Sequence, residues 1–275
     1  MYRVKAQWRR VEHAGRHVPL LILKPVGAKG GAAVLWIHGG GYMTGMKEMA
    51  LFSRGMDLAR RFGAVVVSPG YRLSWMEPYP AAAEDCYWAL LYLKAHAREL
   101  GAREEQIVVG GESAGGGLAA AVCMMARDRG EVRVAFQMPL YPMLDNLDTE
   151  SSRDNHGRVW NTRKNHMGWR MYLRKDAKKD VSPYAAPARQ RDWRGLPPAY
   201  TFVCQGEPFY RETLDFVDKL KENGIWARAD VYPGNTHAFD LLRPWRDESK
   251  RARERCMEAF EYAQGHFMTP REEDV

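Results

Sequence analysis

A serine with a glycine two residues away on either side is the residue of this sequence whose type and spacing point most directly to catalysis. Gly-Glu-Ser-Ala-Gly at residues 111–115 directly follows the apolar run 107–109 and opens a stretch with helical spacing. A strand, a sharp turn and a helix in that order form a nucleophile elbow, which lifts a serine hydroxyl above a sheet. The five-residue pattern alone is weak, and an ordinary serine in a glycine-rich turn is the alternative. Its setting predicts Ser113 as a nucleophile.

A serine nucleophile needs a base, and four histidines follow Ser113 in the chain. Two of them lie in a long irregular stretch and one lies beyond the last helical stretch: His156, His166 and His266. His237 comes just after the strand-like run 226–232. A loop at the carboxyl end of a strand can bring its imidazole to the elbow. We therefore predict His237 as the base, with a plain surface histidine as the alternative.

The base needs a carboxylate that orients it, and Glu207 is the best placed. It follows the strand-like run 199–205, at the same expected sheet edge as Ser113 and His237. A glutamate is one methylene longer than an aspartate, so its backbone must lie slightly farther from the imidazole. Asp240, three residues after His237, is the fallback. Other acidic residues fall inside the next helical stretch and should point elsewhere: Glu212, Asp215 and Asp218.

A glycine loop is the candidate for stabilising negative charge on a substrate oxygen. His-Gly-Gly-Gly at residues 38–41 follows the apolar run 34–37. Ester hydrolysis passes through a tetrahedral oxyanion, and consecutive glycines let backbone N–H groups approach it with no side chain in the way. We assign the oxyanion hole to the amides of Gly40, Gly41 and Ala114, and expect the His38 ring to brace the loop. A simple glycine turn is the alternative.

Large side chains near these loops are candidates for the walls of a substrate cleft, although such residues are as often plain packing. The expected substrate-binding residues are Tyr42, Trp75, Met76, Trp160 and Phe209.

Apolar runs of strand length alternate with stretches of helical spacing along most of the chain. The expected strands are 33–37, 64–68, 106–110, 132–138, 199–205 and 226–232, after an antiparallel hairpin over 6–25. The expected helices are 47–62, 80–99, 114–127, 212–222 and 247–263. This alternation predicts an α/β fold with a mostly parallel central sheet and helices on both faces. Parallel strands place ligands at their carboxyl ends, where the candidate serine, acid and histidine lie.

One stretch, 144–198, interrupts the alternation. It has no clear apolar strand, and a connection of this length is functional or carries small helices of its own. We interpret it as a cap-like insertion above the sheet that helps to wall the cleft. Residues 151–194 contain twelve Lys or Arg but only four Asp or Glu. This basic surface either attracts anionic substrates or is simply a solvated face.

Composition limits the remaining possibilities. A chain of 275 residues with an ordinary apolar content is expected to form one domain over 1–275. Its net charge of +7 comes without the basic and aromatic patterns of nucleic-acid binding. No signal peptide or membrane span is visible, so we expect a cytoplasmic protein. The four cysteines form no C-x-x-C pair, and we expect them to be reduced thiols in or near the core: Cys86, Cys123, Cys204 and Cys256.

Taken together and in order, these motifs resemble the bacterial hormone-sensitive-lipase-like (family IV) esterases of the α/β-hydrolase fold. The resemblance covers about residues 34–239 and rests on the glycine loop 38–41 and the elbow 111–115. Tyr-Arg-Leu at 71–73, Tyr-Pro-Ala-Ala at 79–82, and Leu-Pro-Pro-Ala at 196–199 are also similar to segments of that family. It implies an enzyme with no metal and no organic cofactor, acting on short acyl chains.

Two departures from the family matter. The family usually has Asp-Pro where this chain has Glu207 and Pro208, so the identity of the acid is the least secure part of the resemblance. The family also usually has cap helices before its first strands, and this chain is short there. The acyl pocket is then either more open or completed by the insertion or by a partner subunit.

The resulting hypothesis is a serine carboxylesterase that cleaves small-molecule esters through an acyl-enzyme. An amidase or peptidase with the same three residues is the first alternative, because both reactions pass through the same kind of intermediate. A non-catalytic binding protein on this fold is the second, although a binder has no need of all three groups. The oligomeric state is left open, with a homodimer as one option.

Overall fold

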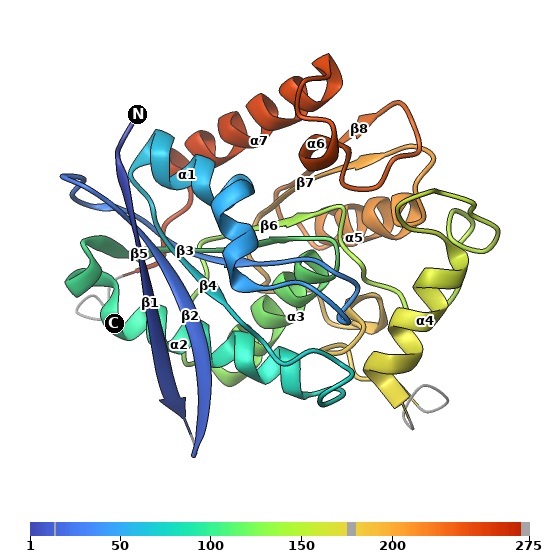
Figure 1. The fold of residues 1–275 in the computed structure, drawn as a ribbon, viewed down its shortest axis with the longest axis horizontal. Coiled ribbons are helices and arrows are strands. Elements are labelled where there is room, and N and C mark those ends of the chain that lie inside the picture. Colours follow the sequence, from blue (N-terminus) through green and yellow to red (C-terminus); the bar gives the residue numbers. More distant parts are fainter. Residues whose placement is uncertain (14, 175–179, 271–275) are drawn as a thin grey trace.

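An eight-stranded sheet forms the centre of the protein, in a computed structural model that describes residues 1–13, 15–174 and 180–270 (Figure 1). The strand order across the sheet is β1-β2-β4-β3-β5-β6-β7-β8. The strands are β1 (Val4–His13), β2 (Arg16–Pro25), β3 (Gly31–Ile37), β4 (Val65–Pro69), β5 (Ala102–Glu112), β6 (Phe136–Leu140), β7 (Ala199–Cys204) and β8 (Ala227–Tyr232).

The sheet is mostly parallel, as predicted. β1 and β2 pair antiparallel from Val4 opposite Pro25 to His13 opposite Arg16, which confirms the expected hairpin. β2 is also antiparallel to β4, whereas every pair from β4–β3 across to β7–β8 is parallel. The carboxyl ends of β3 to β8 therefore meet at one edge of the sheet, where parallel sheets bind ligands.

Helices cover both faces of the sheet (Figure 1). They are α1 (Arg54–Phe62), α2 (Ala81–Leu100), α3 (Ala114–Arg129), α4 (Thr162–Leu173), α5 (Tyr210–Glu222), α6 (Phe239–Leu242) and α7 (Asp247–His266). Leu35 of β3 packs in the core with α2 and α3, whereas its neighbours Val34 and Trp36 pack with α1 and α7. α5 packs with α3 on the first of these faces. Every residue of β3 is buried because the sheet is covered twice.

Some predicted element bounds are wrong. The single helix expected over 47–62 is two helices, the 3₁₀ helix η1 (Lys47–Phe52) and α1, because Ser53 between them is extended at φ −111° and ψ −173°. β6 occupies Phe136–Leu140 and starts later than the run 132–138. β5 starts earlier than expected, at Ala102, and its pairing with β3 shifts register there.

The stretch 144–198 contains small helices, as expected. In its described residues it holds α4 and the 3₁₀ helix η3 (Pro187–Arg189), with no strand. Three of its basic residues lie outside the described residues: Lys175, Lys178 and Lys179. The four cysteines are free and buried, which agrees with their expected role as core thiols. Within the described ranges, no helix combines the length and the apolar character that a membrane crossing requires.

Candidate active site

The candidate nucleophile lies on a strained turn between β5 and α3. Ser113 has φ 57° and ψ −122°, a conformation that non-glycine residues rarely adopt and that is found at functional sites. A Cβ added at Gly111 would lie 2.5 Å from the main-chain oxygen of Ile37, and one added at Gly115 would lie 2.2 Å from it. Only glycines fit on either side of the turn, which explains the pattern Gly-x-Ser-x-Gly.

The three predicted residues lie in direct contact. The Ser113 hydroxyl is 2.8 Å from Nε2 of His237, and Nδ1 of His237 is 2.9 Å from Oε2 of Glu207. With Nδ1–H donating to the carboxylate, Nε2 is left to accept the serine proton. The side chains come from three different loops, and all three residues are buried: Ser113 is 7% exposed, His237 4% and Glu207 0%.

The loops that carry the acid and the base are bonded to each other. The N–H of Gln205 donates to the main-chain oxygen of Tyr232 at 2.9 Å, and that of Gly206 donates to Gly234 at 2.8 Å. These bonds extend the pairing of β7 and β8 beyond the ends of the strands. The backbones of Glu207 and His237 are therefore held in register, which fixes the distance between carboxylate and imidazole.

Burial dominates the electrostatics of the acid. Desolvation raises the pKa of Glu207, and the neighbouring His237 acts in the opposite direction. Oε1 of Glu207 has no hydrogen-bond partner among the described residues, so the imidazole is the main partner of this carboxylate. A buried carboxylate at this distance can stabilise positive charge that develops on an imidazole during proton transfer.

The glycine loop offers free backbone donors beside the serine. Gly40 has φ 120° and Gly41 has φ 60°. In the described part of the chain, the N–H groups of these two residues donate to no other protein group, whereas the carbonyl of Gly40 accepts from Met43 and Thr44 at 3.1 and 3.0 Å. Ala114 is the first residue of α3, where helix N–H groups lack intrahelical partners. These amides could hold an oxyanion.

His38 packs against the loop and is not free to act as a base. Its Nδ1 lies 2.8 Å from the main-chain oxygen of Gly39, and its ring stacks on Tyr71 at 4.2 Å. The Tyr71 hydroxyl donates to the main-chain oxygen of His38 at 3.0 Å. Burial lowers the pKa of His38 to about 4, so the ring is neutral at neutral pH. It braces the loop, as the sequence suggested.

Two of the five expected wall residues lie beside the imidazole. The Phe209 ring meets the His237 ring edge-on at 5.0 Å, and the Trp160 ring lies 6.4 Å from it. The indole also covers the glycine loop, since a Cβ at Gly41 would come within 2.1 Å of it. Nε1 of Trp160 donates to Asn165 of α4 at 3.3 Å. The stretch 144–198 thus places an aromatic side chain beside the imidazole.

The other three expected wall residues lie elsewhere. Tyr42 is 1% exposed, stacks on Tyr172 at 4.0 Å and donates its hydroxyl proton to Met143, so its contacts are those of a core residue. Trp75 and Met76 are 59% and 57% exposed, on the loop between β4 and α2. Among the described residues, no hydrogen bond or ring contact joins either side chain to the three central residues.

Asp240, the fallback acid, does not face the base. It is 2% exposed, and its carboxylate lies 3.7 Å from Arg54 at the start of α1. Burial raises the pKa of Asp240, and the Arg54 guanidinium opposes this shift. Asp240 therefore belongs to a separate buried ion pair, and Glu207 is the carboxylate that the fold presents to His237.

Residues 34–241 match a protein family described as having the alpha/beta hydrolase fold. The chain belongs to the α/β-hydrolase family. The predicted fold class and the resemblance to hormone-sensitive-lipase-like esterases are therefore confirmed.

Proteins similar to this α/β hydrolase bear the names of ester hydrolases. It is 30% identical over 227 residues to an arylesterase of Saccharolobus solfataricus, which covers 81% of this chain and 72% of that protein. It is 26% identical over 231 residues to an ethyl acetate hydrolase of Pseudomonas putida, covering 82% and 72%. A solved structure of a bacterial heroin esterase matches with a TM-score of 0.89 and 34% identity, over 94% of this chain and 84% of that one.

Sequence reasoning about this α/β hydrolase missed three residues near the site. Tyr141 adopts φ 34° and meets the His237 ring edge-on at 5.2 Å. Asn165 holds the Trp160 indole, and Glu212 turns inward from α5 to two backbone amides. An aromatic residue after a strand, or a polar residue inside an amphipathic helix, carries no signal of such contacts.

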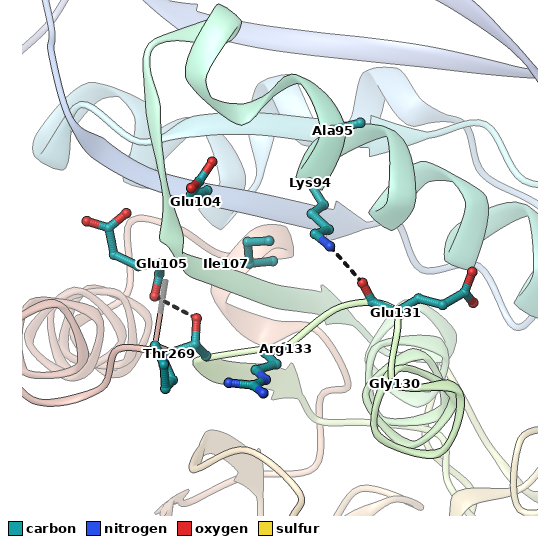
Figure 2. Close-up of a pocket in the computed structure, with 10 residues that line it drawn as sticks. Lys94, Ala95, Glu104, Glu105, Ile107, Gly130, Glu131, Arg133 and Thr269 are labelled. Atoms are coloured by element: carbon teal, nitrogen blue, oxygen red, sulfur yellow. Dashed lines mark hydrogen bonds between the residues drawn. The ribbon is translucent and has the colours of Figure 1, made fainter. Parts of the chain in front are cut away.

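A hollow of about 540 Å³ lies at the other edge of the sheet of this α/β hydrolase, near the amino end of β5 (Figure 2). Lys94 donates there to the main-chain oxygen of Glu131 at 3.0 Å, and the N–H of Thr269 donates to the main-chain oxygen of Glu105 at 2.9 Å. No serine or histidine lines it among the described residues, so it is separate from the site at Ser113. Within those residues, no group of three or more His, Cys, Asp or Glu could hold a metal ion.

Proposed function

We propose that the protein is a serine carboxylesterase that hydrolyses short-chain, acetyl-like acyl esters through an acyl-enzyme. The observation that carries this proposal is the contact series from the Ser113 hydroxyl to His237 at 2.8 Å and from His237 to Glu207 at 2.9 Å. The names arylesterase and ethyl acetate hydrolase among similar proteins support an ester as the bond that is cleaved.

The first half of the reaction acylates the serine. Nε2 of His237 takes the hydroxyl proton as Oγ of Ser113 attacks the ester carbonyl carbon. The N–H groups of Gly40, Gly41 and Ala114 stabilise the oxyanion, and the loss of one such donor would raise the barrier by roughly 3 kcal/mol. His237 then gives the proton to the departing alkoxide, and the alcohol leaves. Glu207 stabilises the imidazolium between these two proton transfers.

The second half releases the acid. A water molecule gives a proton to Nε2 of His237 and attacks the acyl carbon, which forms a second oxyanion at the same amides. The bond to Oγ of Ser113 then breaks, and the proton returns from His237 to the serine. The carboxylic acid leaves, and the enzyme is restored with no cofactor consumed.

The contacts of Trp160 and Phe209 favour a small acyl group. Both rings lie within 6.4 Å of the imidazole, and the indole occupies space directly over Gly41. A long chain on the carbonyl carbon would have to displace one of them. We further propose that residues 144–198 act as a cap-like insertion within one domain, because they supply Trp160 to the site.

The experiment that tests the function is hydrolysis of p-nitrophenyl acetate by the wild type, Ser113→Ala and the control Ser182→Ala. Ser113→Ala should lose hydrolysis while keeping the circular dichroism spectrum and melting temperature of the wild type. Ser182→Ala should retain the wild-type rate, because the Ser182 hydroxyl accepts from the N–H of Tyr184 at 3.2 Å and has no hydrogen bond to His237 among the described residues. Labelling with a fluorophosphonate should modify Ser113 alone. Undiminished turnover by folded Ser113→Ala would reject the proposal.

A further inference from the structure

The segment after β6 connects the loops that carry the catalytic groups. We call residues 140–145 the strap. Its main chain bonds to the elbow on both sides of the nucleophile: the N–H of Ser113 donates to Leu140 at 3.0 Å, and the N–H of Met143 donates to the main-chain oxygen of Ser113 at 3.0 Å. A displacement of the strap would therefore move Ser113 itself.

The strap also holds the glycine loop. The Tyr42 hydroxyl donates to the main-chain oxygen of Met143 at 3.1 Å. Tyr42 directly follows Gly41 and has φ 63°, a backbone conformation that needs support from its surroundings. Met143 thus makes two bonds. Its N–H donates to the carbonyl of Ser113, and its own carbonyl accepts from the Tyr42 hydroxyl, next to the glycine loop. Met143 sets the nucleophile and the oxyanion amides relative to one another.

A buried carboxylate anchors the far end of the strap. Oε1 of Glu212 accepts from the N–H of Leu144 at 3.0 Å, and Oε2 accepts from the N–H of Asp145 at 3.1 Å. Glu212 is 2% exposed and lies in the first turn of α5, the helix that begins three residues after Glu207. The same carboxylate therefore ties the strap to the helix that directly follows the Glu207 loop.

The geometry points to Glu212 as a positioning residue for the reaction. We propose that its two bonds to the strap align Ser113, the oxyanion amides and the Glu207 loop, and that its main effect is on turnover. This inference rests on the proposed esterase function. Glu212 contacts neither His237 nor Ser113 in the described structure, so it acts through the backbone of the strap.

A glutamine at this position tests the carboxylate without changing its size. Both strap amides are donors, and a glutamine has one acceptor oxygen and one donor NH₂ group, so one of the two bonds must be lost. Small misplacements of reacting groups can lower turnover by up to about 100-fold. Glu212→Gln should lower kcat for p-nitrophenyl acetate about tenfold or more and leave KM within about twofold.

The matched control is Glu222→Gln, at the exposed end of the same helix, where Glu222 pairs with Lys219 at 2.7 Å. It should keep the wild-type kcat and KM. All assays are run well below the melting temperature of each variant, so that partial unfolding cannot lower kcat. The rate of fluorophosphonate labelling of Ser113 should fall in parallel with kcat, because that reaction needs the same alignment.

A wild-type kcat in folded Glu212→Gln would overturn the inference, and so would a raised KM with unchanged kcat. If Glu212→Gln does not fold, Tyr42→Phe decides, since it removes only the hydroxyl that bonds to the strap. It should lower kcat about threefold or more at unchanged KM, and an unchanged kcat would overturn the inference. Full activity in Ser113→Ala would instead reject the esterase function, which keeps the two failures distinct.

Discussion

The Glu207 carboxylate contacts the imidazole of His237 and has few other polar partners. Its carboxylate is fully buried, and one of its two oxygens has no partner in the described part of the chain. Burial raises its pKa, so its charge depends on the imidazole that it contacts. In the proposed reaction, an acid of this kind contributes mainly when His237 becomes positive.

Glu207→Gln should therefore lower activity far more than stability. The variant keeps the size of the side chain but cannot stabilise the imidazolium or fix the same tautomer, so kcat should fall about 10³- to 10⁴-fold. The melting temperature should not fall, because a buried charge is removed. Steady-state kinetics with p-nitrophenyl acetate and thermal unfolding measure the two effects. A kcat within tenfold of the wild type would show that another group orients the base.

Trp160→Ala should change the preference for acyl chain length. The indole covers Gly41, and its removal leaves space beside the carbonyl carbon of the substrate. Each additional methylene that such a pocket accepts is worth roughly 1 kcal/mol, so the ratio of kcat/KM for octanoyl over acetyl esters should rise about tenfold or more. Rates over p-nitrophenyl esters of increasing length measure it. Trp8→Ala, in the hairpin, is the control, and an unchanged ratio in Trp160→Ala would contradict a wall role.

The sequence predicted which residues meet but not which way every side chain points. Ser113, Glu207 and His237 each follow a parallel strand of the sheet, and parallel strands bring such positions to one edge. Tyr42 follows the glycine loop in the same way, yet its side chain turns into the core to bond with Met143. That direction depends on a positive φ and on residues from distant elements, which no local pattern encodes.

At the scale of elements, the boundary between η1 and α1 was not visible in the sequence. The apolar residues of 47–62 keep a helical spacing through Ser53, so periodicity predicts one helix. Ser53 is 4% exposed, and its hydroxyl accepts from the N–H of Gly55 at 3.3 Å, which makes it the N-cap of α1. A capping residue inside a periodic stretch can start a new helix, and spacing alone cannot reveal it.

Ser53→Ala should destabilise the protein by about 1 kcal/mol, because the first turn of α1 loses a partner for one N–H group. The free energy of unfolding in urea measures the effect. Ser68→Ala in β4 is a matched control: this serine is also buried, but its hydroxyl has no hydrogen-bond partner in the described structure. The control should not be destabilised. Equal stability of Ser53→Ala and the wild type would show that the cap contributes nothing.

At the scale of the whole molecule, buried ionisable groups join segments that are distant in the sequence. Arg54 of α1 lies 3.1 Å from Asp57 and 3.7 Å from Asp240 of α6. Glu112 at the end of β5 accepts a hydrogen bond of 2.9 Å from Nε1 of Trp36 in β3. The apolar pattern predicted the sheet and its covered faces, but it carries no information about which polar groups share one buried space. The contacts of Arg54 and Glu112 could therefore not be predicted from the sequence.

Glu112 should make the stability of the whole protein depend on pH. Burial raises the pKa of Glu112 from an ordinary value of 4.5 to about 7. The folded state then binds the proton more tightly than the unfolded chain. The protonated side chain therefore makes its whole contribution to stability at pH values below its pKa in the unfolded chain. This contribution is lost as the pH rises through the folded pKa, a total change of about 3 kcal/mol.

Glu112→Gln should remove this dependence, because an amide keeps the acceptor for Trp36 and does not ionise between pH 5 and pH 8. Urea unfolding at both pH values measures the free energy of unfolding. Relative to the wild type, the variant should gain about 2–3 kcal/mol when the pH is raised from 5 to 8. Glu258→Gln on the exposed side of α7 is the control and should show no such change. If Glu112→Gln and the wild type differ by the same amount at both pH values, Glu112 is ionised throughout, and the buried cluster around Arg54 must hold its charge.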